Sequence, residues 1–459
     1  MSKRSGVRFT GSAFAFVAFA CAGGAACGGV SGPGGGNATS GNSSGTLASS
    51  GQGSGQGASG AASGSVFGMS GSDTAPSGAP DAAGSGAGGS DASAAADSPI
   101  EGGIPSFGDS GVTDPGSAGD GDRTIGPNYT PDPLVTAQAG AQKGQTISFQ
   151  MLGSQSKIYP GINGSYTRGV SVYIPKQYVP GTPAPLIVTQ DAMGQGQLPT
   201  VLDNLISANK LPKIVVLFVG NGGGDAVGSE RGLEYDTVSG LFAEFIQTEV
   251  VPRAITEVKT RLNIDLKITD DPEARMTLGG SSGGAASFSM AWWHPDLFHK
   301  VLTYSGTYVT QVPANSPFPH GCWIYHDVDP YNMAMPNGLI VQHCESAAGF
   351  TGDSAPAPCD TPLSQMACEA VTGCAWNTKV NRPIRIWHES GTNDLGAGGA
   401  PGGYRNFDLA NQRMAAAFKL RGYHYHYDHA LGAGHVDGRA VSQTLPEALL
   451  WVWRGYPVN

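Results

Sequence analysis

Basic residues are almost missing from the first quarter of this 459-residue chain, since no Lys or Arg occurs between Arg8 and Arg123. The same stretch holds nine acidic residues, whereas 23 basic and 27 acidic residues nearly balance from Arg123 onward. No basic stripe is therefore present to neutralise phosphates, which argues against a nucleic-acid-binding protein. Long apolar runs are missing as well. After the N-terminus, no run of about twenty apolar residues, the length needed to span a bilayer, occurs in the chain.

The N-terminus has the residue order of an export signal. Basic residues precede an apolar run at positions 13–21, and small residues fill positions 22–26. Cys27 then opens a Gly-rich stretch, so the segment resembles a bacterial lipoprotein signal whose first mature residue is a lipidated cysteine. Cys21 is a competing processing site, and plain secretion is the alternative to lipidation. Residues 1–27 are therefore expected to direct export, with a lipid on Cys27 as the protein's link to the cell envelope.

Aromatic and aliphatic residues are scarce from 28 to 125, where Gly, Ser, Ala and Asp dominate. Such a composition cannot bury enough apolar surface to offset the entropy of ordering the chain, so we expect a disordered tether. A coil of ~95 residues spans about 50–60 Å. The remainder, 130–459, has an ordinary globular composition and is long enough for one domain with a buried core.

Strand and helix patterns alternate through residues 130–459. Two runs, 185–189 and 213–219, are apolar apart from Thr189 and Lys213 at their ends, which predicts buried strands in a sheet covered on both faces. Helical periodicity follows at 239–258. Further strands are expected at 170–175, 275–278, 300–304, 383–387 and 423–428, and further helices at 284–293, 407–421 and 445–453. This order predicts an α/β fold with a doubly wound, mostly parallel sheet.

Glycine and serine cluster at one strand-to-helix junction, Gly279-Gly-Ser-Ser-Gly-Gly284. A G-x-S-x-G motif on such a turn exposes a serine hydroxyl above the sheet, because the glycines relieve crowding in the turn. The motif fits two registers, centred on Ser281 or on Ser282. Another match at 41–45 has no strand before it and no helix after it, so the context favours the junction.

The stretch 279–298 resembles the nucleophile region of the esterase D and enterochelin-esterase-like family of α/β-hydrolases. In that family two glycines follow the serine closely and an H-P-D-x-F segment follows further along, as it does here at 294–298. The family's spacing to Pro295 implies that Ser281 is the nucleophile, with Ser282 as the alternative. The resemblance also implies an α/β-hydrolase fold in which the backbone N–H of Ser282 stabilises the oxyanion.

In α/β-hydrolases an acid and then a histidine follow the nucleophile along the chain. Two later segments, Gly391-Thr-Asn-Asp394 and Gly432-Ala-Gly-His435, resemble the acid and histidine loops of the family. The resemblance implies that Asp394 orients the imidazole and that His435 acts as general base and then general acid. Glu389 is the substitute if Asp394 merely caps a turn. Because the histidine must be neutral to accept a proton, the rate is expected to fall below about pH 6.5.

A second oxyanion donor is expected from the loop after an early strand. The segment 190–193 resembles the family's Gln-Asp-Gly segment, with Ala in place of Gly. The backbone N–H of Asp191 or of Ala192 is therefore the candidate donor. Arg231 with Glu234-Tyr-Asp236 also resembles a family segment, for which we expect a structural ion pair and loop anchor rather than contact with substrate.

Histidines and an aspartate share one face of the last predicted strand, at His424, His426 and Asp428. A facial metal site is one interpretation of this pattern. Packing beside the histidine loop is the better one, because the strand leads directly into that loop. We expect neither a metal nor an organic cofactor.

Cysteines concentrate late in the chain, at Cys322, Cys344, Cys359, Cys368 and Cys374. The family crosses this region with a shorter connection, so residues 335–380 are interpreted as an insert stapled by disulfides in an exported protein. Five cysteines permit two bridges with one left over, and the pairing stays open. Zinc is disfavoured because two C-x-x-C knuckles are missing. Since the insert leaves the sheet near the acid loop, we expect it to form a lid or a substrate wall.

The resemblance spans residues 145–458 and implies a serine carboxylic-ester hydrolase with an acyl-enzyme intermediate. Its members include enterochelin, feruloyl and acetyl-xylan esterases, S-formylglutathione hydrolases and mycolyltransferases. Export favours a small-molecule or polysaccharide-linked ester as substrate. One alternative is an acyltransferase on the same triad. The other is a catalytically silent binding or adhesive lipoprotein, and the complete triad order disfavours this second alternative. The oligomeric state is not predicted.

Overall fold

The computed structural model describes residues 116–458 apart from 163, 225–227, 310–321, 327–337, 347–358, 360–364, 378–380 and 398–404. The expected signal segment 1–27, with Cys21 and Cys27, lies outside the described residues, and so does most of the expected tether. Within the described part of the chain, no helix has the length and hydropathy needed to cross a membrane.

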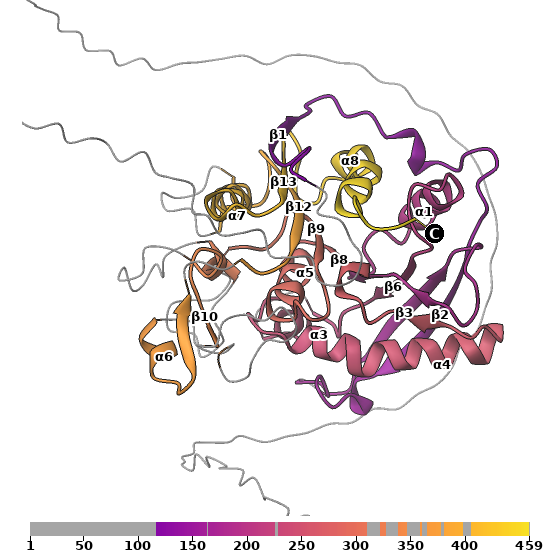
Figure 1. The fold of residues 1–459 in the computed structure, drawn as a ribbon, viewed down its shortest axis with the longest axis horizontal. Helices are drawn as coiled ribbons and strands as arrows, with labels where there is room; N and C mark the ends of the chain where they lie inside the picture. The colour runs from indigo at the N-terminus through magenta and orange to yellow at the C-terminus, as the bar shows by residue number, and fades with distance from the viewer. Residues whose placement is uncertain are drawn as a thin grey trace, which may run out of the picture. The chain divides into compact units, whose positions relative to one another are not determined.

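A nine-stranded sheet forms the centre of the fold, in the order β1-β13-β12-β9-β8-β5-β6-β3-β2 (Figure 1). The strands are β1 (Gly121–Ile125), β2 (Gln145–Leu152), β3 (Thr167–Ile174), β5 (Leu186–Gln190), β6 (Val215–Val219), β8 (Arg275–Gly280), β9 (Lys300–Tyr304), β12 (Arg385–Gly391) and β13 (Tyr425–Ala430). All neighbouring pairs are parallel except β2 with β3 and β3 with β6. The short strands β4 (Pro183–Ala184) and β7 (Lys267–Ile268) form a separate parallel pair.

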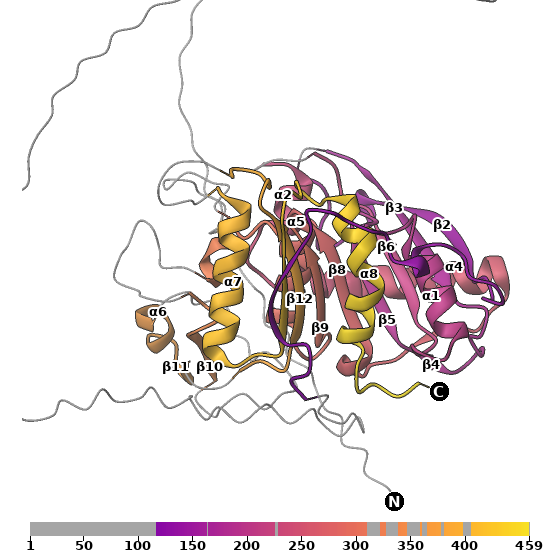
Figure 2. The same ribbon diagram turned by 90° about the horizontal axis from the view of Figure 1, so that it is seen from above.

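Helices cover both faces of the sheet (Figure 2). The helices are α1 (Leu198–Ser207), α2 (Glu230–Tyr235), α3 (Leu241–Phe245), the π-helical η3 (Ile246–Val250), α4 (Val251–Leu262), α5 (Ser282–Trp293), α6 (Gln365–Glu369), α7 (Phe407–Arg421) and α8 (Gly438–Val452). Short 3₁₀ segments are η1 (Pro133–Val135), η2 (Gly153–Gln155), η4 (Pro272–Ala274) and η5 (Cys322–Tyr325). Apolar residues of α1 and α8 pack on one face, and those of α3, α4, α5 and α7 pack on the other. The expected doubly wound, mostly parallel α/β sheet is confirmed.

The folded domain starts earlier than the sequence predicts. Strand β1 pairs in parallel with β13, so residues 121–125 belong to the sheet and not to the tether. Arg123 donates to both carboxylate oxygens of Asp428 on β13, at 2.6 and 3.0 Å. The strand has one buried apolar residue, Ile125, which leaves too little hydrophobic pattern for a sequence-based assignment.

Two disulfides close the Cys-rich insert. Cys344 is bonded to Cys368 and Cys359 to Cys374, while Cys322 is buried and free. Strands β10 (His343–Ser346) and β11 (Cys374–Asn377), which carry one cysteine of each bridge, form an antiparallel pair. Two bridges with one cysteine left over match the expectation. Because disulfides persist in oxidising surroundings, the bridges indicate an extracellular protein.

Candidate active site

The turn between β8 and α5 has a strained backbone conformation. Ser281 has φ 56° and ψ −131°, outside the regions that residues with a Cβ favour. A Cβ on Gly279 would lie 2.1 Å from the carbonyl oxygen of Gly283, so the turn requires glycine there. This geometry is the sharp elbow that the motif predicts, with Ser281 at its apex.

Three predicted residues from separate loops meet at this elbow. His435 Nε2 lies 2.8 Å from Ser281 Oγ, and His435 Nδ1 lies 2.6 Å from Asp394 Oδ1. The Asp394 side chain is fully buried, whereas that of His435 is 23% exposed. A hydroxyl, an imidazole and a buried carboxylate therefore stand in hydrogen-bonded sequence, with the imidazole accessible from solvent.

Backbone contacts fix the acid and histidine loops against each other. The N–H of Asn393 donates to the carbonyl of Ala433 at 2.9 Å. A Cβ on Gly391 would come within 2.2 Å of that same carbonyl oxygen. The two loops can therefore lie this close together only with glycine at the end of β12. Phe407, the first residue of α7, packs edge-on against the His435 ring at 4.9 Å between centroids. The imidazole is therefore held by packing as well as by hydrogen bonds.

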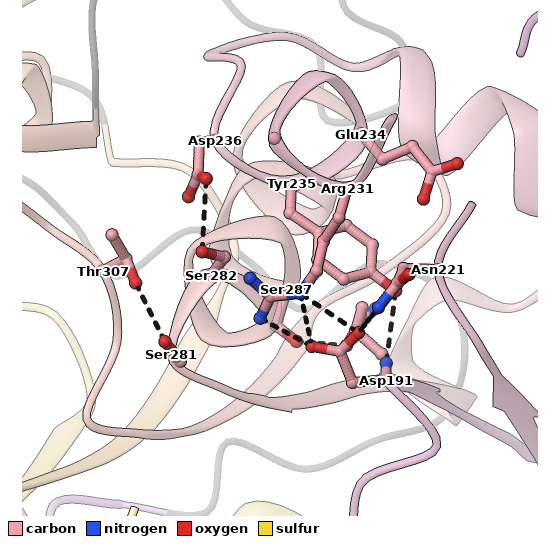
Figure 3. Close-up of polar contacts among 12 residues, drawn as sticks. Asp191, Asn221, Arg231, Glu234, Tyr235, Asp236, Ser281, Ser282, Ser287 and Thr307 are labelled. Atoms are coloured by element: carbon pink, nitrogen blue, oxygen red, sulfur yellow. Dashed lines mark hydrogen bonds and ion pairs between the residues drawn. The ribbon is translucent and has the colours of Figure 1, made fainter. Parts of the chain in front are cut away.

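Ser282 points away from His435. Its side chain is buried and its Oγ donates to Asp236 Oδ2 at 3.2 Å, whereas Ser281 Oγ faces Thr307 at 3.4 Å (Figure 3). The geometry thus favours the register centred on Ser281. As the first residue of α5, Ser282 has no intrahelical acceptor for its N–H, which suits the expected oxyanion donor.

The other expected oxyanion donors have acceptors inside the protein. The N–H of Ala192 donates to the carbonyl of Val219 at 3.1 Å, and that of Asp191 donates to the hydroxyl of Tyr235 at 3.2 Å. Asp191 and Ala192 both have positive φ, 55° and 52°, so the chain turns sharply after β5 and directs these groups into the protein. This corrects the expected second donor: of the predicted residues, Ser282 alone keeps its N–H at the elbow.

The segment carrying Arg231 forms the expected ion pair. Arg231 donates to Asp191 Oδ2 from Nη2 at 2.7 Å and from Nε at 3.0 Å, and Asn221 donates to Asp191 Oδ1 at 2.6 Å (Figure 3). Glu234 pairs with Arg168 on β3 in the domain interior. Both pairs fix α2 next to the strand ends, where the arginine holds the strained loop after β5.

Glu389 does not contact His435. Its side chain is buried on β12, and neither carboxyl oxygen has a hydrogen-bond partner among the described residues. Burial, and then the charge of Asp394, raise the pKa of Glu389 well above its ordinary value. This environment disfavours the ionised form of Glu389, and Asp394 is the carboxyl group that contacts the imidazole.

The predicted strand face at 424–428 is used in packing. His424 Nδ1 lies 2.7 Å from Asp120 Oδ2, and His426 Nε2 lies 3.1 Å from Asp428 Oδ1. Asp428 also pairs with Arg123. In the part of the chain that the structure describes, no group of three or more His, Cys, Asp or Glu side chains is arranged to hold a metal ion.

The described part of the Cys-rich insert lies away from Ser281. The ring of His343 packs edge-on against Trp292 at 5.3 Å, and Arg421 donates to the carbonyl of Val341 at 2.6 Å. Trp292 and Arg421 are at the C-terminal ends of α5 and α7, and the length of α5 separates Trp292 from Ser281 by about 16 Å. The expected lid or substrate wall is therefore wrong for the described residues of the insert.

Comparisons with known proteins give a family and a fold. A family model described as putative esterase matches residues 165–451. A search of curated proteins gives no match. The enterobactin esterase of Shigella flexneri is 17% identical, with 69% of this chain and 61% of that chain covered and a TM-score of 0.40. A ferulic acid esterase of the anaerobic fungus Anaeromyces mucronatus is 14% identical, with coverage of 72% and 98% and a TM-score of 0.43. Because the family model covers more than half of the chain, this protein belongs to the putative esterase family and is an esterase.

Proposed function

We propose that the protein is an exported serine hydrolase of carboxylic esters, with Ser281 as nucleophile, His435 as base and Asp394 as orienting acid. The observation that carries this proposal is the 2.8 Å distance between His435 Nε2 and Ser281 Oγ. The 2.6 Å contact between His435 Nδ1 and Asp394 supports it, because it fixes the tautomer whose Nε2 can accept a proton.

In the first half-reaction Ser281 Oγ attacks the ester carbonyl while its proton passes to His435 Nε2. Asp394 stabilises the imidazolium, which then gives the proton to the departing alcohol and leaves an acyl-enzyme. A water molecule attacks the acyl carbon in the second half-reaction, with the same imidazole as base. The N–H of Ser282 faces the developing oxyanion at the positive end of the α5 dipole.

A fluorophosphonate probe tests the nucleophile directly. Wild type should be labelled, and Ser281→Ala should lose the label together with ester hydrolysis, by about 10⁴-fold or more in kcat. Ser282→Ala is the matched control, because it keeps the backbone N–H and removes a hydroxyl that points toward Asp236. Labelling of Ser281→Ala at the wild-type rate, or its loss in Ser282→Ala alone, would refute the assignment. An unlabelled wild type would favour a silent binding protein.

The substrate that we propose is an ester outside the cytoplasm, either of a small molecule or linked to a polysaccharide. The disulfides and the N-terminal signal pattern support export. A panel of acetyl, aryl and hydroxycinnamoyl esters, measured with and without an added alcohol, tests both parts. A product in which the acyl group has moved to the alcohol faster than to water would identify an acyltransferase.

A further inference from the structure

Two carboxyl groups, that of Glu389 on β12 and that of Asp394 in the loop after it, lack hydrogen-bond partners at three oxygens in the described part of the chain. Both oxygens of Glu389 and the Oδ2 atom of Asp394 are buried, and none of the three has a partner among the described residues. Asp394 Oδ1, in contrast, receives two contacts, from His435 and from the backbone N–H of Leu395 at 2.7 Å. A buried carboxyl oxygen without a hydrogen-bond partner costs free energy, so a donor shared between the two groups would be stabilising.

The neighbours of Glu389 on the sheet have partners of their own. Glu389 lies between Asp428 on β13 and Tyr304 on β9 in the strand register. Asp428 is bound by Arg123, and the hydroxyl of Tyr304 lies 3.1 Å from the hydroxyl of Thr444 on α8. Within the described residues, no cation pairs with Glu389.

An ionised Glu389 would therefore be a buried anion beside other anions. Burial raises its pKa most, followed by the charges of Asp394, Asp428, Asp437 and Asp408. Desolvation and like charges both disfavour the ionised form of such a group and favour the protonated one. A protonated carboxyl has what an ionised one lacks, an O–H donor.

We propose that Glu389 keeps its proton and is a positioning residue of the triad, whose O–H is linked to Oδ2 of Asp394 through one bridging water. The proposal rests on the function proposed above, because Asp394 matters only if the triad is used. One proton then satisfies oxygens of both carboxyl groups and pins the plane of the Asp394 carboxylate. Oδ1 stays aligned with the imidazole, and Glu389 adds no second negative charge beside it.

Variants at position 389 separate this role from the alternatives. Glu389→Leu removes the donor, and kcat should fall about 10- to 100-fold with little change in KM, as expected for a lost hydrogen bond to a charged group. Glu389→Gln keeps a donor without charge and should stay within about 3-fold of wild type. If glutamine is as damaging as leucine, Glu389 acts as an anion and the proposal fails. A leucine variant with wild-type kcat would equally overturn it.

The pH profile adds a readout that a merely structural role would not move. Without the Glu389 donor the negative charge on Asp394 is less shared, so it stabilises the imidazolium more strongly. The acid limb of kcat/KM should therefore shift to higher pH in Glu389→Leu and stay in place in Glu389→Gln. Thermal unfolding should show that Glu389→Leu is less stable than wild type and that Glu389→Gln is not, because leucine removes the donor that serves the buried Oδ2 of Asp394. A profile that does not shift contradicts the proposal.

Infrared spectroscopy tests the proton itself, without reference to activity. A carbonyl stretch of a buried protonated carboxylic acid should be present at neutral pH and vanish in Glu389→Gln. The same comparison in the Ser281→Ala background separates the two proposals. Loss of the band in that background as well supports the protonated Glu389 even if the serine assignment is wrong, and a wild-type spectrum without the band rejects the protonated Glu389 even if the serine assignment is right.

Discussion

Ser281 illustrates at the scale of one residue how backbone strain and a proposed catalytic role coincide. Its φ of 56° costs a residue with a Cβ of order 1–3 kcal/mol, which the surrounding turn has to offset. The backbone N–H of Ser281 donates to the carbonyl of Tyr304, and its carbonyl accepts from Thr307, both at 3.0 Å. These contacts to β9 and the segment after it hold the elbow, so that the hydroxyl stands above the sheet within reach of His435.

Glu273 links stability to pH at a site far from the elbow. It accepts from the Lys300 ammonium at 2.7 Å and lies 2.6 Å from His299, all three being buried. Burial alone would raise the pKa of Glu273, but the charges of Lys300 and His299 lower it to about 2. Because this value lies below that of the unfolded chain, the pair contributes stability above about pH 4.5 and loses it as the pH falls towards 2.

Glu273→Gln should therefore lower the free energy of unfolding at pH 7 by about 3–5 kcal/mol, since it leaves the Lys300 charge buried without an anion. The difference from wild type should shrink between pH 5 and pH 2, as measured by urea unfolding at each pH. Glu257→Gln is the control, because Glu257 pairs with half-exposed arginines on α4 and should cost about 0.5 kcal/mol or less. A difference between Glu273→Gln and wild type that does not depend on pH would contradict the argument.

At the scale of elements, the disulfides of the Cys-rich insert lead to a testable prediction. Its described strands pack at the C-terminal ends of α5 and α7, so opening the disulfides should loosen this region without moving the elbow. Replacing Cys344 and Cys368 by serine should cost about 3 kcal/mol of stability in the loop that they close. Activity on a small ester should stay within about 2-fold, because Ser281 lies a helix length away.

The measurement pairs unfolding with kinetics for this double variant and for the Cys359 and Cys374 double variant. Cys322→Ala, which alters the buried free thiol and leaves both bridges, is the control for the loss of sulfur. A fall in kcat/KM that follows the loss of a bridge at temperatures where the protein stays folded would restore the lid interpretation.

The elements that sequence patterns predicted well are those buried on both faces. The runs at 185–189 and 213–219 became β5 and β6 because continuous apolar residues have no other stable environment in this fold. Edge strands were missed, since β1 and β2 show mostly exposed polar residues. The helix expected at 239–258 is interrupted by a π-helical turn just before Pro252, because proline cannot supply the N–H that continues the regular ladder.

The candidate site likewise has features that residue types indicate and features that depend on the direction of the backbone. Chain order and the family resemblance selected Ser281, Asp394 and His435 from the sequence, and the structure places their side chains within hydrogen-bonding distance. The oxyanion donors depend on where a backbone N–H points, which no residue type encodes. Ala192 has a positive φ and its N–H donates to the carbonyl of Val219. This orientation of the N–H is seen only in the structure.

At the scale of the whole molecule, charge is distributed unevenly along the chain. Of the formal charge of −10, the first eight residues contribute +3, the stretch to Asp122 contributes −9 and the remainder −4. The domain that carries the elbow is therefore nearly neutral for its size. A nearly neutral enzyme domain gains little electrostatic steering of charged substrates, so we expect selectivity among esters to depend on the shape of the site rather than on net charge.

The N-terminal segment carries the last prediction, on where the enzyme is held. We propose that Cys27 is lipidated after removal of the signal and that residues 28–115 link the lipid to the folded domain. Cys27→Ser should then release the enzyme from the membrane fraction with kcat/KM unchanged, because no described residue of the site depends on this segment. Cys21→Ser is the matched control and should remain membrane-bound. Mass spectrometry of the mature N-terminus should detect acyl chains on Cys27, and an unmodified N-terminus downstream of Cys27 would establish a secreted enzyme instead.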